Sequence, residues 1–411
     1  GTALPVAEDY LYTEQGMGLA LDRLALDGLV CVVMPVNLPP RAGLRIPATI
    51  MATMRARGLE PGPRLALIRT QTRLLLLASI RPLSPTDERL IREFCGQRWF
   101  DLAWLPHLAP EEANQYTALA QPWFYEGMAA LLGPDNKEFM DNHIFALHPA
   151  SDDRPYANSF LRWGTLPELL PQMGRGGISL MEQGGLIIAA SLAQAVLAAS
   201  LFILAPVLLA RRTRIRGGRK LAQTGYFLAL GLGYLVVELM VMKRAALWLG
   251  DPLLAVAVVL AVFLPLTGLG SGYAGRILGR GSSKGQAGLG CAVIGIVLSA
   301  LLVFWGGHFL GSALLALPLW ARICGVAVLT GPLAFCMGLP FPLGLARVAA
   351  QNPERTPWLW AVNGCGSVVG PLLAQLVVVE WGIAATAVCA IGLYLVAWRL
   401  ARVMVEPAGQ W

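Results

Sequence analysis

The chain has 411 residues, of which 56% are hydrophobic and only 14% are charged. Soluble domains carry roughly 25% charged residues, so this composition excludes a soluble or a disordered protein. The net charge of +7 is unevenly divided: residues 1–182 carry 20 acidic and 16 basic side chains, whereas residues 183–411 carry 5 acidic and 16 basic ones. We therefore predict a soluble domain over residues 1–180 and a membrane domain over residues 181–411.

Helix-like and strand-like runs alternate in the soluble part. Residues 28–36 are continuously apolar and rich in β-branched side chains, which is typical of a strand buried on both faces. Ser84 precedes acidic residues in the pattern of a helix N-terminus. The expected elements, in chain order, are a helix over 16–26, a strand over 28–36, a helix over 44–58, strands over 64–69 and 73–79, a helix from Ser84 and a strand over 100–105. This order predicts an α/β domain with a partly parallel sheet.

A glycine-rich phosphate-binding turn is missing from this soluble part. Nucleotide-binding sheets carry such a turn after their first strand. Residues 1–180 contain no strand followed by G-x-G-x-x-G. We therefore interpret them as a partial Rossmann-like domain, the second half of a nucleotide-binding fold, to be completed by an upstream segment or another chain. Because the chain begins at Gly1 rather than methionine, we expect a processed or truncated start.

The second part contains apolar runs long enough to cross a membrane. We predict about seven transmembrane helices, near residues 184–210, 224–248, 253–275, 287–306, 320–346, 357–380 and 382–401. The connecting segments on one side carry 13 lysines and arginines, and those on the other side carry 3. Basic residues favour the cytoplasmic side. This predicts a multi-pass protein of the bacterial inner membrane, with a cytoplasmic C-terminus and residues 1–180 on the periplasmic side.

Five segments carry a recognisable set of motifs. They are Glu8-Asp9-Tyr10-Leu11-Tyr12-Thr13, Asp152-Asp153-Arg154-Pro155, Glu238 to Arg244, the GLPFPLG run at 338–344, and Trp360 to Gly364. Together they resemble the C-terminal portion of the membrane-embedded branch of the spermidine synthase-like family, whose soluble domain is an S-adenosylmethionine-type Rossmann fold. The resemblance implies a part of an aminopropyl- or methyltransferase acting in polyamine-type chemistry.

In that family the cofactor loop and the catalytic aspartate lie upstream of the segment that resembles residues 8–13. The resemblance therefore assigns no catalytic residue to this chain. It implies S-adenosylmethionine or its decarboxylated form as cofactor only if the missing half is supplied. The expected partners are the lipid bilayer and the chain or segment that supplies this half, and we expect no nucleic acid.

Two groups of residues in the soluble part are candidate site residues. Glu8, Tyr10 and Tyr12 are predicted to line the mouth of a cofactor crevice, or alternatively to form a loop that enters a helix. Asp152, Asp153 and Arg154 have the charges to grip an amine or a carboxylate. Alternatively, they join the end of the soluble domain to the membrane surface through caps and ion pairs. No cysteine or histidine spacing indicates a metal site.

Glu238 is the one acidic residue predicted to lie deep within a membrane span. An unpaired carboxylate there costs at least a few kcal/mol, so a partner is expected. The candidate partners are Lys243, Arg244, Asn363 and Arg322. Glu238 is predicted to form either a proton or cation path or a neutral or ion-paired structural lock.

Three functions remain open at this point. The first is part of a transferase that uses a sulfonium donor. The second is a non-catalytic membrane scaffold or partner subunit of a larger complex, which the predicted periplasmic location favours because the sulfonium donor is made inside the cell. The third is ion or solute translocation that uses Glu238.

Overall fold

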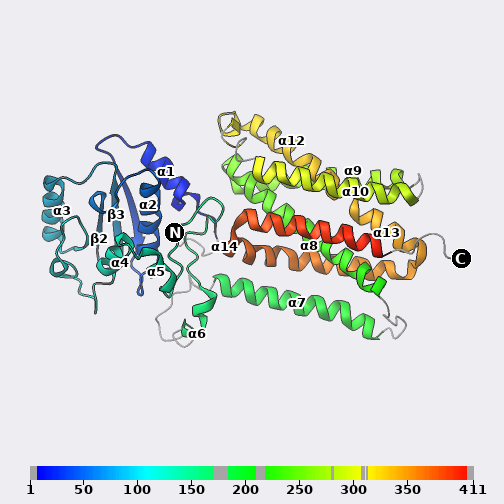
Figure 1. Ribbon diagram of the computed structural model, residues 1–411, viewed down its shortest axis with the longest axis horizontal. Helices are drawn as coiled ribbons and strands as arrows, with labels where there is room; N and C mark the ends of the chain where they lie inside the picture. Colours follow the sequence, from blue (N-terminus) through cyan, green and yellow to red (C-terminus); the bar gives the residue numbers. More distant parts are fainter. Residues whose placement is uncertain are drawn as a thin grey trace. The chain divides into compact units, whose positions relative to one another are not determined.

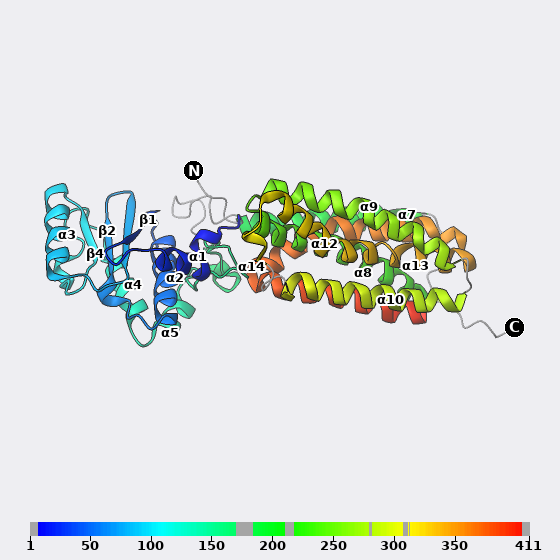
Figure 2. The same cartoon turned by 90° about the horizontal axis from the view of Figure 1, so that it is seen from above.

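The computed structural model describes residues 7–169, 184–209, 218–278, 282–306, 311 and 313–404. The chain divides into two compact units, Gly1–Ile187 and Ile188–Trp411, both drawn in Figures 1 and 2. The domain boundary that the sequence placed at residue 180 lies outside the described residues. The first unit combines a small sheet with helices, and the second consists of long helices.

The first unit contains a four-stranded sheet with strand order β1-β3-β2-β4. Its strands are β1 (Leu29–Pro35), β2 (Leu65–Arg69), β3 (Arg73–Ser79) and β4 (Asp101–Trp104). All three strand pairs are antiparallel, so the prediction of a partly parallel sheet is wrong. β2 and β3 form a hairpin, which inserts β3 between β1 and β2. β1 and β2 run in the same direction but do not pair with each other, and the same is true of β3 and β4.

Helices cover both faces of this sheet. On one face, α1 (Glu14–Asp22), α2 (Ala42–Ala56), α4 (Trp123–Leu132) and α5 (Asn136–Asn142) contribute to the main apolar core. On the other face, α3 (Pro85–Arg98) packs over a smaller core, as Figures 1 and 2 show. Alternate residues of β2 enter the two cores, since Leu67 belongs to the first and Ile68 to the second.

The N-terminus of α3 confirms the start that the sequence predicts. Ser84 Oγ accepts a hydrogen bond from the Asp87 amide at 3.2 Å, and Asp87 Oδ2 accepts one from the Ser84 amide at 2.9 Å. This reciprocal arrangement is a capping box, which satisfies two backbone donors that the helix itself leaves unpaired.

β1 is an edge strand with an exposed apolar face. Leu29 and Val33 are 46% and 62% exposed, and Cys31 between them is also exposed. Val32 and Met34 point to the opposite face and are buried in the main core. Among the described residues, only β3 pairs with β1. We call Leu29, Cys31 and Val33 the open face of β1.

The second unit consists of long apolar helices. They are α7 (Gly184–Leu209), α8 (Gly218–Leu249), α9 (Pro252–Leu278), α10 (Ser282–Leu301) with its π-helical continuation Leu302–Gly306, α12 (Leu319–Met337), α13 (Pro340–Gln351) and α14 (Thr356–Val403). Within the described residues, six helical segments are long and apolar enough to cross a membrane. This unit is therefore that of a membrane protein.

The last of these six segments, at Pro353–Val403, is 51 residues long, or about 76 Å at 1.5 Å per residue. This is more than twice the roughly 30 Å of a bilayer core. Gly382 interrupts it with φ 90° and ψ 174°. Gln223 of α8 contacts both ends, because it accepts a hydrogen bond from Arg355 and donates one to the Met404 carbonyl at 3.1 Å. α14 thus folds back as two arms, 356–381 and 383–403 (Figure 1), which explains why the sequence predicted about seven crossings.

Glycines bring α8 close to the first arm of α14. A Cβ atom added at Gly366 would lie 3.0 Å from the Leu228 carbonyl oxygen, and one at Gly370 would lie 3.0 Å from that of Leu232. Small residues four positions apart are typical of such close helix contacts. A helix break is present near Pro340, because α12 ends at Met337 and α13 begins at Pro340.

Candidate functional site

Two distant segments of the soluble unit lie side by side. The Asp9 amide donates to the Pro155 carbonyl at 2.7 Å, and the Glu14 amide donates to the Ala150 carbonyl at 2.8 Å. Between these bonds lie a short 3-10 helix, Tyr10–Tyr12, and the start of α1. The backbone therefore brings residues 8–14 against residues 150–155.

Side chains from the two segments form one hydrogen-bonded group. Glu8 accepts hydrogen bonds from the hydroxyls of Tyr10 at 3.0 Å and Tyr156 at 3.3 Å. The Thr13 hydroxyl donates to Asp152 Oδ1 at 2.7 Å, although the two residues are 139 positions apart. We call Glu8, Tyr10, Thr13, Asp152 and Tyr156 the carboxylate–tyrosine cluster. It joins residues from both groups that the sequence proposed separately.

The other sequence-predicted residues of this region have different surroundings. Tyr12 is partly buried against the main apolar core rather than hydrogen-bonded within the cluster. The Arg154 amide donates to the Ser151 carbonyl at 2.8 Å and so closes a turn. The Asp152 amide donates to Gln15 Oε1 at 3.0 Å. These contacts hold the 151–154 turn within the soluble unit, and its predicted role at the membrane surface stays a prediction.

Sequence reasoning missed Thr13 and Tyr156 as members of the cluster. Thr13 is fully buried and accepts a hydrogen bond from the Gly16 amide at 3.0 Å, so it is also the N-cap of α1. Its position directly before Glu14 is the usual signal for such a cap. Tyr156 is 1% exposed, and nothing in its local sequence points to a partner at Glu8.

The surroundings of the cluster keep the Tyr10 hydroxyl neutral. Burial and the neighbouring Glu8 carboxylate raise the pKa of Tyr10 well above its usual value, so this hydroxyl remains a donor. Burial also raises the pKa of Asp9. Carboxylates attract cations such as amines or sulfonium groups. In the described part of the chain, no group of three or more histidine, cysteine, aspartate or glutamate residues could hold a metal ion.

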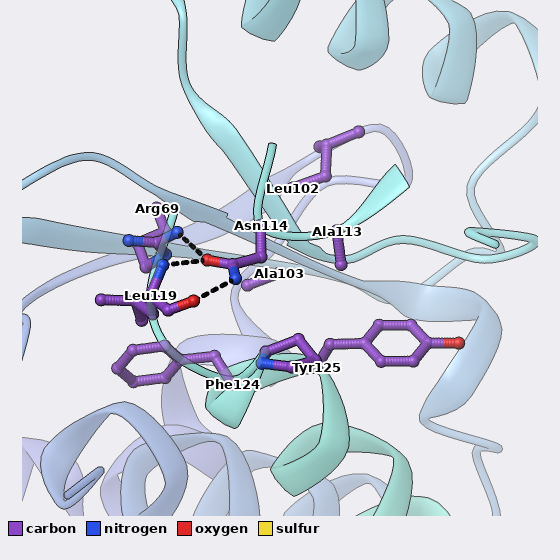
Figure 3. A pocket seen from close by; sticks show the side chains of 9 residues that line it. Arg69, Leu102, Ala103, Ala113, Asn114, Leu119, Phe124 and Tyr125 are labelled. Carbon is purple, nitrogen blue, oxygen red and sulfur yellow. Dashed lines mark hydrogen bonds between the residues drawn. The ribbon is translucent and has the colours of Figure 1, made fainter. Parts of the chain in front are cut away.

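A second polar group surrounds the buried Arg69 on β2 (Figure 3). Its Nη2 atom donates to Asp101 Oδ2 at 2.8 Å, to Asn114 Oδ1 at 2.9 Å and to the Thr117 carbonyl at 2.8 Å. Asp101 also accepts the Tyr116 amide at 2.8 Å. These bonds fix the loop after β4 against the edge of the sheet.

The cavity beside Arg69 is too small for a cofactor. Its volume is about 10 Å³, with Ala103, Leu119 and Phe124 among its lining residues. That is room for about one water molecule. The residues here do not fit a nucleoside, so we interpret the Arg69 group as structural.

In the membrane unit, the predicted partners of Glu238 bind elsewhere. Arg244 Nη2 donates to the Phe304 carbonyl at 2.7 Å, and Asn363 Nδ2 donates to the Phe227 carbonyl at 3.1 Å. Arg322 donates to the carbonyls of Leu317 and Leu315, which precede its own helix α12. Within the described residues, Glu238 forms no hydrogen bond or ion pair with any of these side chains or with Lys243, which lies five positions further on α8.

No protein-family model, curated protein or solved structure matches this chain. Its function must therefore be argued from its own residues.

Proposed function

We propose that this chain is the C-terminal portion of a membrane-embedded, spermidine synthase-like protein. In this proposal the soluble unit supplies one wall of a cation-binding site to an aminopropyl- or methyltransferase-like assembly. The observation that carries the proposal is the carboxylate–tyrosine cluster. Its two segments each contain a motif of the family resemblance, and they meet in space although Thr13 and Asp152 are 139 positions apart.

The open face of β1 supports the view that another segment completes the unit. Leu29 and Val33 are exposed on an edge strand that no described strand pairs on its outer side. Such an edge is a template for a further strand. An α/β half-domain from an upstream segment or a separate chain would cover these side chains and supply the nucleotide-binding turn.

The chemistry of the cluster suits the charged parts of the proposed reactants. A sulfonium donor and an amine acceptor are both cations, and the Glu8 and Asp152 carboxylates favour cations near them. The Tyr10 and Tyr156 hydroxyls fix the orientation of Glu8. Since the cavity beside Arg69 does not fit a nucleoside, the nucleotide part of the donor would have to be held by the added half.

A non-catalytic scaffold is the second candidate. The charge asymmetry of the loops favours a periplasmic soluble unit, whereas the sulfonium donor is made inside the cell. In this alternative the cluster has a structural role and holds residues 8–14 against residues 150–155. The open face of β1 then serves only to bind another subunit of the complex.

Calorimetry on the whole assembly distinguishes the two. The assembly is purified from native membranes and titrated with S-adenosylmethionine and with its decarboxylated form. The enzyme proposal predicts binding that Glu8→Gln weakens by roughly 10- to 150-fold, since a hydrogen bond to a charged group contributes about 1.5–3 kcal/mol. The control is Glu111→Gln, which changes an exposed carboxylate on the 3-10 helix Pro110–Glu112 and should leave binding unchanged.

An assembly that binds neither compound, and whose soluble unit is labelled from the periplasm at an engineered surface cysteine, would reject the enzyme proposal. The scaffold would then remain.

A further inference from the structure

Glu238 is buried in the middle of the helical unit. It is 6% exposed and lies on α8, eleven residues before the end of the helix at Leu249. At 1.5 Å per residue this is about 16 Å from that end. Glu238 lies within Arg219–Leu249, a segment long and apolar enough to cross a membrane.

The nearest hydroxyl on the same helix is already used. Tyr234 lies one turn before Glu238, and its hydroxyl is 3.2 Å from the Thr267 hydroxyl of α9. The Thr267 hydroxyl donates to the Ala334 carbonyl of α12 at 3.1 Å. The Thr267 hydroxyl has only one proton, which it donates to Ala334, so the Tyr234 hydroxyl must be the donor in its bond to Thr267. Tyr234 consequently has no proton left to donate to the carboxyl of Glu238.

In the described part of the helical unit, the elements packed against α8 place no cation against this carboxyl. From α14, the buried Tyr394 lies close enough to Glu238 to interact electrostatically, but a tyrosine hydroxyl is not a cation. The guanidinium of Arg347 on α13 lies near Tyr226, three turns before Glu238. Arg244 of α8 itself is engaged with the Phe304 carbonyl. From α12, Cys336 packs against α10 at Gly295 and is likewise uncharged.

We propose that Glu238 is a proton-binding site of the membrane unit, occupied by a proton at neutral pH. An ionised carboxylate within an apolar bundle, with no described side chain that donates a hydrogen bond to it or pairs with its charge, is strongly unfavourable, and binding a proton removes the charge. Release of the proton then requires a rearrangement that brings water or a cation to Glu238. This site is independent of the proposed transferase, because it uses no residue of the carboxylate–tyrosine cluster.

Infrared spectroscopy on the full chain in lipid nanodiscs tests the proposal. At pH 7, the protein should show the C=O stretching band of a protonated carboxylic acid, with a shift in deuterated water. Glu238→Gln should remove this band, and Glu238→Asp should move it. The matched control is Glu380→Gln, at another glutamate of the helical unit, two residues before the Gly382 turn, and it should leave the band in place.

Two results would overturn the proposal. The first is the absence of any protonated carboxyl band from the unmodified protein at pH 7. This result does not depend on whether a variant folds. The second is a band that persists unchanged in Glu238→Gln. Since glutamine is a neutral side chain of the same shape, the proposal also expects Glu238→Gln to melt at the same temperature as the unmodified protein, whereas loss of an ion pair would lower it.

Discussion

Replacing Thr13 by valine removes one hydroxyl from the centre of the carboxylate–tyrosine cluster while keeping the shape of the side chain. The hydroxyl accepts the Gly16 amide at 3.0 Å and donates to Asp152 Oδ1 at 2.7 Å. Thr13 is fully buried, so water cannot replace these bonds without disturbing the surrounding segments. The variant therefore tests whether this contact holds the two segments together.

The expected loss follows from the two bonds. Removal of an N-cap costs about 1 kcal/mol, and a hydrogen bond to a charged group contributes about 1.5–3 kcal/mol. Together they predict that Thr13→Val lowers the free energy of local opening by about 3 kcal/mol. This corresponds to roughly 100-fold faster amide exchange in residues 8–16 and 150–156, provided that exchange proceeds through local opening.

Hydrogen–deuterium exchange with mass spectrometry on the full chain measures this effect peptide by peptide. Thr70→Val is the control, because its hydroxyl caps an exposed turn and accepts the Arg73 amide at 3.0 Å. The control should change exchange only in the β2–β3 turn. If Thr13→Val left both segments as protected as before, the cluster would not hold them together, and the proposed site would lose its basis.

Three further predictions concern the soluble unit. Asp101→Ala leaves the buried Arg69 guanidinium without its carboxylate. Urea titration should show a free energy of unfolding lowered by about 3–5 kcal/mol. The control Asp22→Ala, at an exposed ion pair, should have little effect in the same titration. The raised pKa of Tyr10 keeps this group protonated in the folded state where the unfolded state ionises, so stability should fall above about pH 10 by at most about 1.4 kcal/mol per pH unit. Tyr10→Phe should remove this contribution to the loss of stability, as measured by unfolding curves at several values between about pH 9 and 11. An identical dependence of stability on pH in both proteins would contradict this prediction. Burial lowers the pKa of His143, so the unfolded state takes up a proton first and stability should decrease as the pH falls below about 6.5; His143→Gln should flatten this acid limb.

Much of the local structure could be predicted from the sequence. The cap at Ser84 depends on neighbours within one helical turn, and it is present. The membrane-spanning segments follow from long apolar runs, and even the fold-back at Gly382 coincides with the boundary predicted between the last two runs. These features are set by short-range patterns, which a single sequence contains.

The features that the sequence missed depend on contacts between distant residues. Strand direction was wrong because pairing is decided when the β2–β3 hairpin inserts beside β1, and no local pattern records this. The bond between Glu8 and Tyr156 joins residues 148 positions apart. The burial of Glu238 was expected, but its proposed partner Arg244 binds a backbone carbonyl instead.

The most direct test concerns the claim that another segment completes the soluble unit. A photo-crosslinking amino acid is placed at Val33, on the open face of β1, and irradiated in native membranes; the same amino acid at the exposed Glu111 is the control. We predict that Val33 forms an adduct with a peptide from a strand next to a glycine-rich turn, either upstream in the same chain or in a partner, and that Glu111 does not. Full incorporation at Val33 without any such adduct would show that this edge is free in the membrane and would contradict the account.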